Sequence, residues 1–140
     1  MIVVDTSVAS DLMRPSPAAA VQGWIRSHAP RELCTTAITA AEIHYGIERL
    51  PPGRRKEALR VAAAEIFEAF AEQVLPFDTT AAEQYARVVS QRDALGLPID
   101  GFDAQTAAIC RAHGAALATR NLADFRKTGV EIINPWQAGR

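Results

Sequence analysis

The chain has 140 residues, of which 49% are hydrophobic, and its formal net charge at pH 7 is −1. This length suits one domain, residues 1–140, with a hydrophobic core of ordinary size. No apolar run approaches the roughly 20 residues of a transmembrane helix, and the strand-like start Met1-Ile2-Val3-Val4 lacks the features of a signal peptide. These properties argue against a membrane protein and predict a cytoplasmic one.

The near-neutral charge gives the chain as a whole no signature of nucleic-acid binding, although a group of catalytic acids would mask basic residues in the sum. The two cysteines, Cys34 and Cys110, are far apart in the sequence and show none of the Cys/His spacing of a zinc site. We therefore expect both to be buried, reduced thiols.

Strand-like and helical patterns alternate between the N-terminus and Pro51. Apolar residues at helical spacing from Val21 to Ile25 predict one face of a helix. Thr39 could cap a later helix that carries Glu42 at its third position, which is the capping-box pattern. The elements expected in this part are strands at about 2–4 and 33–35, and helices at about 8–13, 21–28 and 39–50.

The alternation continues after the break at Pro51-Pro52-Gly53. A helix from Asp100 should end at Gly114, because glycine is the usual residue just beyond a helix C-terminus. The expected elements are helices at about 55–72, 79–96 and 100–113, and strands at about 74–76, 115–118 and 131–133. This order favours a three-layer α/β/α sandwich with a mainly parallel sheet of four to five strands.

Four acidic residues carry the main chemical information, because each lies beside an apolar run where a strand ends or a helix begins. They are Asp5, Glu42, Asp103 and Asp124. A carboxylate in such a place costs free energy unless it is paired or binds a metal. Four that meet in one cleft, at the carboxyl ends of the strands, would suit a hard divalent cation such as Mg²⁺ or Mn²⁺.

Helix capping offers a purely structural interpretation of the same acids. Asp5 could cap a helix that begins near Ser7, and Glu42 could complete the capping box. Asp100 could be the N-cap of its helix, with Asp103 stabilised by the helix dipole. For Asp124 the structural alternative is a solvated side chain.

The other polar candidates carry less information. The histidines at positions 28, 44 and 113 show no ligand spacing, and we expect them at the surface or at the edge of the core. Arg120 could contact a phosphate or simply cover part of the surface.

Five segments together resemble the PIN-domain ribonucleases, and specifically the VapC-type toxins of bacterial toxin–antitoxin pairs. They are IVVDTSV, ITAAEIHYGIERL, LPIDGFDAQTAAICRAHG, ATRNLADF and VEIINPWQ, in the order found in that family. The resemblance implies a Mg²⁺- or Mn²⁺-dependent endoribonuclease that uses a metal-activated water. It also implies a homodimer, an RNA substrate and an antitoxin partner.

The resemblance also assigns roles to particular residues. Metal binding and catalysis fall to the four acids, Asp5, Glu42, Asp103 and Asp124. Some members of the family carry the last acid at the position of Asn121, but here the match favours Asp124. The supporting residues are Thr6, Asp100, Thr119 and Asn121, and for Asp100 we favour a helix cap over an accessory ligand.

Three other functions are weighed against this one. A haloacid-dehalogenase-type phosphatase needs a second Asp two residues after the first, where this chain has Ser7. A receiver-type signalling domain needs an acceptor Asp after a central strand, which Cys34-Thr35-Thr36 does not supply, and a late Lys, for which only Lys127 is present. A catalytically inactive PIN-fold binding module would not need all four acids.

Overall fold

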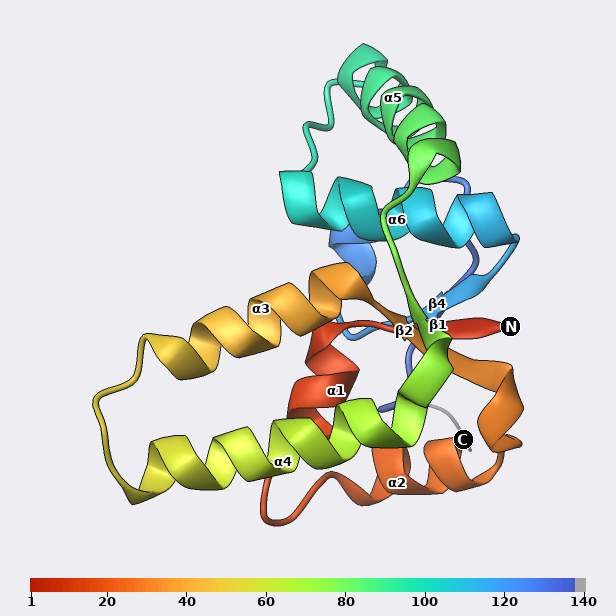
Figure 1. Cartoon of the computed structure of the whole chain (residues 1–140). Coiled ribbons are helices and arrows are strands. Elements are labelled where there is room, and N and C mark those ends of the chain that lie inside the picture. Colours follow the sequence, from red (N-terminus) through yellow and green to blue (C-terminus); the bar gives the residue numbers. More distant parts are fainter. Residues whose placement is uncertain (138–140) are drawn as a thin grey trace.

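The computed structural model describes residues 1–137, which contain a five-stranded parallel sheet (Figure 1). The strands are β1 (Ile2–Val4), β2 (Leu33–Thr36), β3 (Val74–Leu75), β4 (Ala116–Ala118) and β5 (Ile132–Ile133), in the order β3-β2-β1-β4-β5. The predicted parallel sheet is confirmed, with β3 at one edge. Because the chain adds β2 and β3 on one side of β1 and β4 on the other, the strand order reverses between β1 and β4.

Six α-helices accompany the sheet in the described part of the chain. They are α1 (Thr6–Leu12), α2 (Ala19–Arg26), α3 (Ala37–Glu48), α4 (Arg54–Phe70), α5 (Thr79–Ala94) and α6 (Gly101–His113). The described part also contains three short 3-10 helices, namely η1 (Pro30–Glu32), η2 (Ala71–Gln73) and η3 (Leu122–Phe125). No helix within residues 1–137 combines the length and the apolar character needed to cross a membrane.

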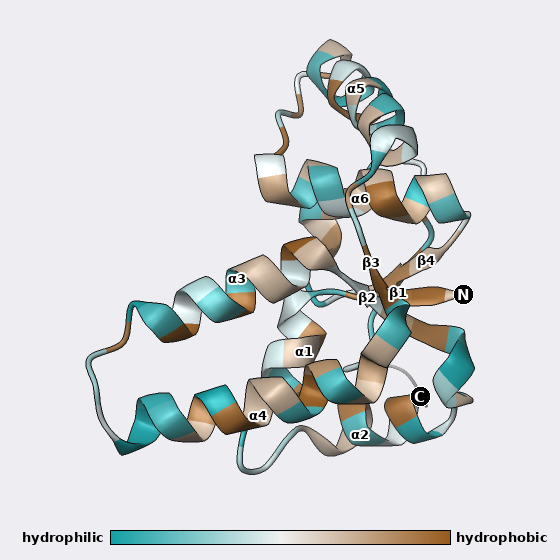
Figure 2. Cartoon of the chain, viewed as in Figure 1, coloured by the Kyte–Doolittle hydropathy of each residue, from teal (hydrophilic) through white to brown (hydrophobic). Residues whose placement is uncertain are grey.

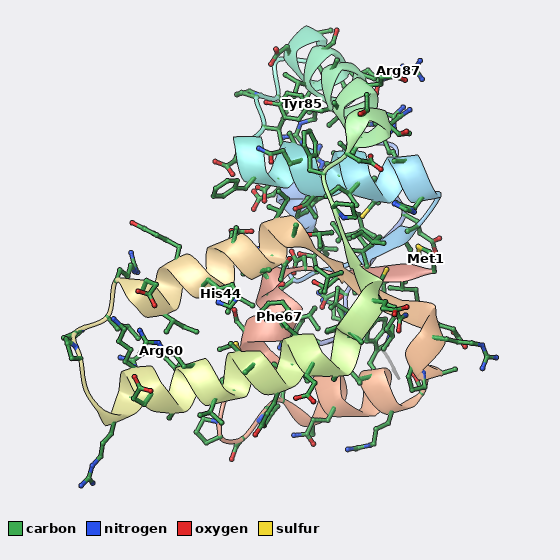
Figure 3. All side chains as sticks on the ribbon, viewed as in Figure 1. Met1, His44, Arg60, Phe67, Tyr85 and Arg87 are labelled. Atoms are coloured by element: carbon green, nitrogen blue, oxygen red, sulfur yellow. The ribbon has the colours of Figure 1, made fainter. Side chains whose placement is uncertain are left out.

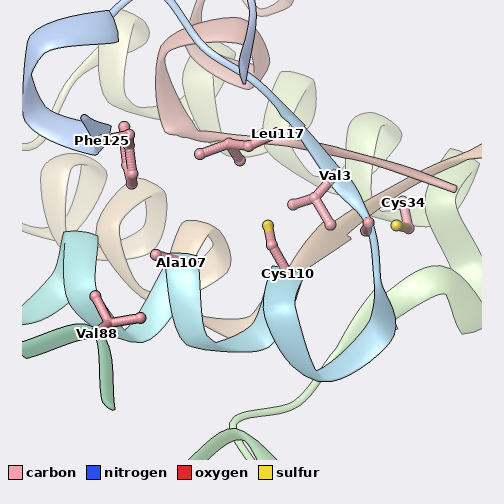
Figure 4. Packing of buried hydrophobic residues seen from close by; sticks show 8 residues of the cluster. Val3, Cys34, Val88, Ala107, Cys110, Leu117 and Phe125 are labelled. Carbon is pink, nitrogen blue, oxygen red and sulfur yellow. The ribbon is translucent and has the colours of Figure 1, made fainter. Parts of the chain in front are cut away.

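The layers follow from the alternation of side chains along the strands, which sends neighbouring residues to opposite faces. Val3 and Leu117 pack on one face against α5 and α6, as Figure 4 shows for Val88, Ala107 and Cys110. On the other face Val4, Leu33 and Ala118 pack against α1, α2 and α4. Both faces are covered, so the strands are mostly apolar, and the two polar residues at the end of β2, Thr35 and Thr36, are buried as well. The predicted three-layer sandwich is confirmed.

Helices α3 and α4 extend from the sheet as a hairpin (Figure 1). Their inner faces pack together through Ile43, Ile47 and Ala63, while the outer turns are hydrophilic (Figure 2). Near the free end the guanidinium of Arg60 donates to Glu48 Oε1 at 3.0 Å and to Glu57 Oε1 at 2.6 Å (Figure 3). The hairpin therefore has a small core of its own and a charged free end.

The helix N-termini confirm two capping predictions and overturn a third. Asp5 caps α1 and Asp100 caps α6, each through a carboxylate that accepts a backbone N–H. The predicted capping box of Thr39 and Glu42 is wrong, because β2 runs straight into α3 and Thr36 takes the N-cap position. The Thr36 hydroxyl accepts the N–H of Thr39 at 3.1 Å, which leaves the Thr39 hydroxyl available for other contacts.

Candidate active site

The acids predicted from the sequence gather at the carboxyl edge of the sheet. Asp5 directly follows β1, and Thr119 directly follows β4, at the point where the strand order reverses. Glu42 lies on α3, the helix that begins where β2 ends, and Asp103 lies in the first turn of α6. In open parallel sheets this is the place where ligands bind.

The carboxylate of Asp5 is almost fully enclosed, with 6% of the residue exposed. Its Oδ1 accepts from the Ser7 N–H at 2.8 Å and from the Ser7 hydroxyl at 2.6 Å. Its Oδ2 accepts from the Thr119 hydroxyl at 2.5 Å. Burial raises the pKa of Asp5, while these hydrogen bonds oppose the rise. Asp5 therefore caps α1 and also joins β1 to β4.

The carboxylate of Glu42 is half-buried and is bound by one hydroxyl. Thr6 Oγ1 donates to Glu42 Oε1 at 2.8 Å, and the same hydroxyl lies 3.3 Å from Thr39 Oγ1. Burial raises the pKa of Glu42, and repulsion from Asp5 and Asp100 acts in the same direction, while the Thr6 hydrogen bond opposes it. Glu42 is thus held toward the other acids.

Asp103 is the acid on which the repulsion of the whole group is most evident. The pKa of its carboxyl is raised to about 6, first by burial and then by repulsion from other carboxylates. These repelling groups are, from strongest to weakest, Asp124, Asp100, Glu42 and Asp5. All four acids singled out in the sequence, together with Asp100, therefore act on one another electrostatically.

Asp124 lies on η3 and its side chain is exposed. Within residues 1–137, no hydrogen bond reaches the side-chain oxygens of Asp124 or of Asp103. The cluster thus divides in two. We call Asp5 and Glu42 the hydroxyl-bonded pair, and Asp103 and Asp124 the unbonded pair.

The predicted supporting residues occupy different positions. Thr6 and Thr119 donate directly to the hydroxyl-bonded pair. Asn121 takes part through its backbone, since its N–H donates to Thr119 Oγ1 at 3.0 Å. Asp100 is an exposed helix cap whose Oδ2 accepts the N–H of Phe102 at 3.0 Å, and its charge still acts on Asp103.

The sequence did not reveal the contacts that three residues make in or near the cluster, namely Ser7, Thr39 and Arg92. Ser7 makes two hydrogen bonds to Asp5, and its place two residues after an N-cap Asp is a signal that could have revealed it. Thr39 was assigned to a cap that it does not form. Arg92, a buried residue of α5, donates to the backbone oxygen of Asp124, and nothing in its sequence context indicates this.

The remaining polar candidates lie outside the cluster. The guanidinium of Arg120 stacks over the ring of Trp136, 4.8 Å from its centroid, and so covers part of the surface. His44 and His113 are exposed, and His28 lies at the edge of the core against Trp24. Both cysteines are free and buried, as predicted.

The donor chemistry of the cluster suits a hard cation, because every candidate ligand is a carboxylate oxygen. As the side chains lie, however, no three Asp, Glu, His or Cys residues in the range 1–137 are grouped closely enough to enclose a metal ion. The carboxylates therefore share one region and repel one another without forming a closed cage.

A groove of about 550 Å³ adjoins the cluster between α1, α3 and α4. Its lining includes Thr6 and Glu42 from the cluster, the arginines Arg14, Arg49 and Arg55, and apolar side chains such as Ile43, Ile47 and Leu59. The groove thus borders both the acids and a set of positive charges.

Comparison with known proteins adds a second line of argument. The family model described as PIN domain matches residues 2–131. The plasmid stability protein StbB of Pseudomonas syringae pv. tomato is 39% identical, over 99% of this chain and 100% of that protein. The VapC ribonuclease Y4jK of Sinorhizobium fredii is 38% identical, over 98% and 99% of the two chains. The toxin FitB of Neisseria gonorrhoeae is 34% identical, over 97% and 99%.

Solved structures give the same result. The structure of FitAB bound to an IR36 DNA fragment contains a chain that superposes with a TM-score of 0.91 and is 33% identical, covering 100% of this chain and 99% of its own. FitAcB from Neisseria gonorrhoeae reaches a TM-score of 0.90 at 34% identity, covering 98% and 99%. DNA-bound VapBC from Salmonella typhimurium, at 20% identity and a TM-score of 0.84, covers 96% and 97% and supports the fold alone.

Proposed function

This chain belongs to the PIN-domain family, among its VapC-type members, and from that membership we propose that it is an endoribonuclease that acts as the toxin of a toxin–antitoxin pair. The observation that carries the proposal is the group of mutually repelling carboxylates at the carboxyl edge of the sheet. Family membership removes the phosphatase and receiver-domain alternatives. We further propose that residues 1–140 form one nuclease domain.

We assign the metal-binding and catalytic roles to the four acidic residues. Asp5, Glu42, Asp103 and Asp124 would hold Mg²⁺ or Mn²⁺. When bound, such a cation lowers the pKa of a water ligand and stabilises the charge that develops on a phosphate. Clustered carboxylates repel one another until a cation neutralises them, which gives this group its affinity.

The protein's own groups prepare the cluster for that role. The hydroxyls of Ser7 and Thr119 fix both oxygens of Asp5, and the Thr6 hydroxyl fixes one oxygen of Glu42. Such outer partners orient metal-binding carboxylates in other proteins. The supporting roles proposed for Thr6 and Thr119 rest on these contacts.

Water is the proposed nucleophile because the protein's thiols are unsuited to the task. Burial raises the pKa of the Cys34 thiol to about 11, and it raises the pKa of Cys110 as well. A thiol attacks as its thiolate, and both cysteines therefore stay protonated near neutral pH.

The partners are proposed from the relatives. The relatives are named a toxin, FitB, and a VapC ribonuclease, Y4jK, and we propose that this chain binds an antitoxin. We also propose that it forms a homodimer. A guanidinium or ammonium group of the antitoxin, placed among Glu42 and Asp103, would pair with the carboxylates and compete with the metal. The cytoplasm is the compartment in which we expect it to meet RNA.

The test of the activity uses metal-free protein and total cellular RNA, with and without added Mn²⁺, followed by mapping of the cleaved ends. Wild-type protein should cut at defined positions only when Mn²⁺ is present, and Asp103→Asn should not cut. A parallel reaction with single-stranded DNA tests the preference for RNA. Full cleavage by EDTA-treated wild type would refute the metal mechanism, and no cleavage under any condition would favour an inactive binding module.

The toxin assignment is tested in cells. Induced expression of the chain alone should slow bacterial growth, whereas Asp5→Asn at the same protein level should not. Co-expression of a short protein encoded by a neighbouring reading frame should restore growth. If cells that express wild type and cells that express Asp5→Asn both grow normally, the chain is not a toxin and its nuclease activity serves another purpose.

A further inference from the structure

A buried arginine ties together the two segments that carry the unbonded pair of acids. Arg92 lies near the end of α5 and is 6% exposed. Its side chain donates only to backbone carbonyl oxygens. The bonds run from Nε to Leu97 O at 2.7 Å, from Nη1 to Asp124 O at 3.0 Å and Arg126 O at 2.6 Å, and from Nη2 to Pro98 O at 3.2 Å.

The environment of Arg92 is unusual for a buried charge. No ion pair involves it among the described residues, whereas Arg14 and Arg60 both pair with carboxylates. Removing an unpaired charge from water is unfavourable, and here carbonyl dipoles replace the lost hydration. Four hydrogen bonds engage nearly all of the five N–H donors of a guanidinium. Because burial of this charge is unfavourable, we infer that Arg92 is kept there to hold the four carbonyl groups in place.

The carbonyls belong to two segments that are separate in sequence. Residues 97–98 lead directly into Asp100, the N-cap of α6, and so into Asp103 in its first turn. Residues 124–126 contain Asp124 and follow β4. The one guanidinium of Arg92 therefore binds the backbone of both the segment that leads to Asp103 and the segment that contains Asp124.

We propose that Arg92 is a positioning residue that holds the segment of Asp124 against the start of α6, so that Asp103 and Asp124 can share one cation. The inference rests on the proposed function for the metal-binding role of these acids. The link between the two segments stands on the hydrogen bonds alone.

The unbonded pair needs such a tie because its own contacts are weak. Asp124 and Asp103 repel each other. Within η3, the backbone bond from Asp124 N to Asn121 O is 3.2 Å, at the upper end of the usual range, and the bond from Arg126 N to Ala123 O is longer, at 3.4 Å. Phe125 anchors the segment in the core. The carbonyl oxygens of Asp124 and Arg126, on either side of Phe125, are held by hydrogen bonds from Arg92.

Only arginine has the geometry for this task. Its donors are spread over a rigid planar fork, whereas the three donors of lysine start from one nitrogen atom. Arg92→Lys therefore keeps the charge but cannot reach both segments. Arg111→Lys is the matched control, because Arg111 also donates through Nη1 to a carbonyl, Thr128 O at 3.2 Å, but not to the segments at 97–98 or 124–126.

The first experiment measures backbone hydrogen–deuterium exchange in the metal-free proteins. Arg92→Lys should speed exchange in peptides covering 97–103 and 121–126, while exchange in the sheet and in the α3–α4 hairpin stays as in wild type. Arg111→Lys should leave both segments unchanged. Unchanged exchange in both segments of Arg92→Lys would overturn the proposal, whatever the protein does with metal.

The second experiment measures Mn²⁺ binding by titration and by the rise in Tm that Mn²⁺ causes. Loss of an outer partner of a metal site typically costs about 10- to 100-fold in affinity, and we expect a loss in this range for Arg92→Lys. In an Asp124→Asn background the same change should cost much less, since the two residues act through one another. Equal losses in both backgrounds would show that Arg92 does not act through Asp124.

Failure of this inference differs from failure of the proposed function. If wild type shows no response to Mn²⁺, the metal-binding role falls, and the exchange experiment still decides whether Arg92 ties the segments. If wild type binds Mn²⁺ and Arg92→Lys binds it equally well at a lower Tm, Arg92 serves only stability and the proposal is wrong. Should Arg92→Lys fail to fold, Arg92→Gln, which buries no charge, is expected to give the same two results.

Discussion

The hydroxyl-bonded pair and the unbonded pair of acids lie in one cluster but are held in opposite ways. Asp5 and Glu42 accept hydrogen bonds from Ser7, Thr119 and Thr6. Asp103 and Asp124 accept none on their side chains among the residues described, and only the backbone of their segments is fixed. The first pair is therefore oriented before any cation binds. The carboxylates of the second pair have no such partners and are free to turn toward a cation.

This difference has an electrostatic consequence. Hydrogen bonds stabilise the ionised form of a carboxyl, and burial and neighbouring negative charges destabilise it. At Asp5 the two effects oppose each other, whereas at Asp103 only the destabilising ones act. A cation would therefore bring greater relief to Asp103 than to Asp5.

The largest effect is expected from Asp5→Asn. Asparagine is as good an N-cap as aspartate, so the fold should persist, while the loss of cleavage should exceed the roughly 10- to 100-fold typical of an outer partner. Asp124→Asn should cost less, because Asp124 is exposed. Cleavage rates at saturating Mn²⁺ measure both. Equal losses would remove the distinction between the two pairs.

Removal of one hydroxyl from the bonded pair should have the next largest effect. Thr119→Val deletes the hydrogen bond to Asp5 Oδ2, and we expect a reduction in cleavage of about 10- to 100-fold. Thr35→Val is the control, since it deletes a buried hydroxyl that bonds Val4 O at 2.9 Å and touches no acid. If the two variants lose the same activity, the effect comes from stability and not from orientation of Asp5.

Asp103, one member of the unbonded pair, should make the stability of the protein depend on pH. The folded-state pKa of Asp103 is raised from 3.8 to about 6, so the folded protein binds this proton more tightly than the unfolded chain does. Stability is therefore lost as pH rises through this window. Asp103→Asn should match wild type in Tm near pH 4 and exceed it at pH 7 without metal. A Tm difference that does not change with pH would contradict the raised pKa.

The smallest effect is expected at Asp100. Serine is also a good N-cap, and Asp100→Ser should therefore keep α6 intact and retain most of the cleavage rate at saturating Mn²⁺. Its loss of charge should slightly ease ionisation of Asp103. An activity loss as large as that of Asp103→Asn would make Asp100 a member of the metal-binding set.

Features that depend on local physics could be predicted from the amino-acid sequence. The strand-helix alternation, the strand near Val74 and the end of α6 at Gly114 were predicted from apolar spacing and turn chemistry. The structure confirms them, and Gly114 has the expected left-handed conformation with φ of 61°. Caps by Asp5 and Asp100 were likewise readable, because a cap depends on neighbours within a few residues.

Contacts between distant parts of the chain could not be predicted in this way, because they depend on how the elements pack. Thr119 and Asp5 are 114 positions apart, and Arg92 and Asp124 are 32 apart. The wrong capping box at Thr39 has the same origin, because the end of β2 is fixed by the pairing of Thr35 and Thr36 with β3 and not by the helix that follows. Local patterns predict where an acid stands along its own element. Only the packing of parallel strands and their helices determines which hydroxyl or guanidinium group meets it.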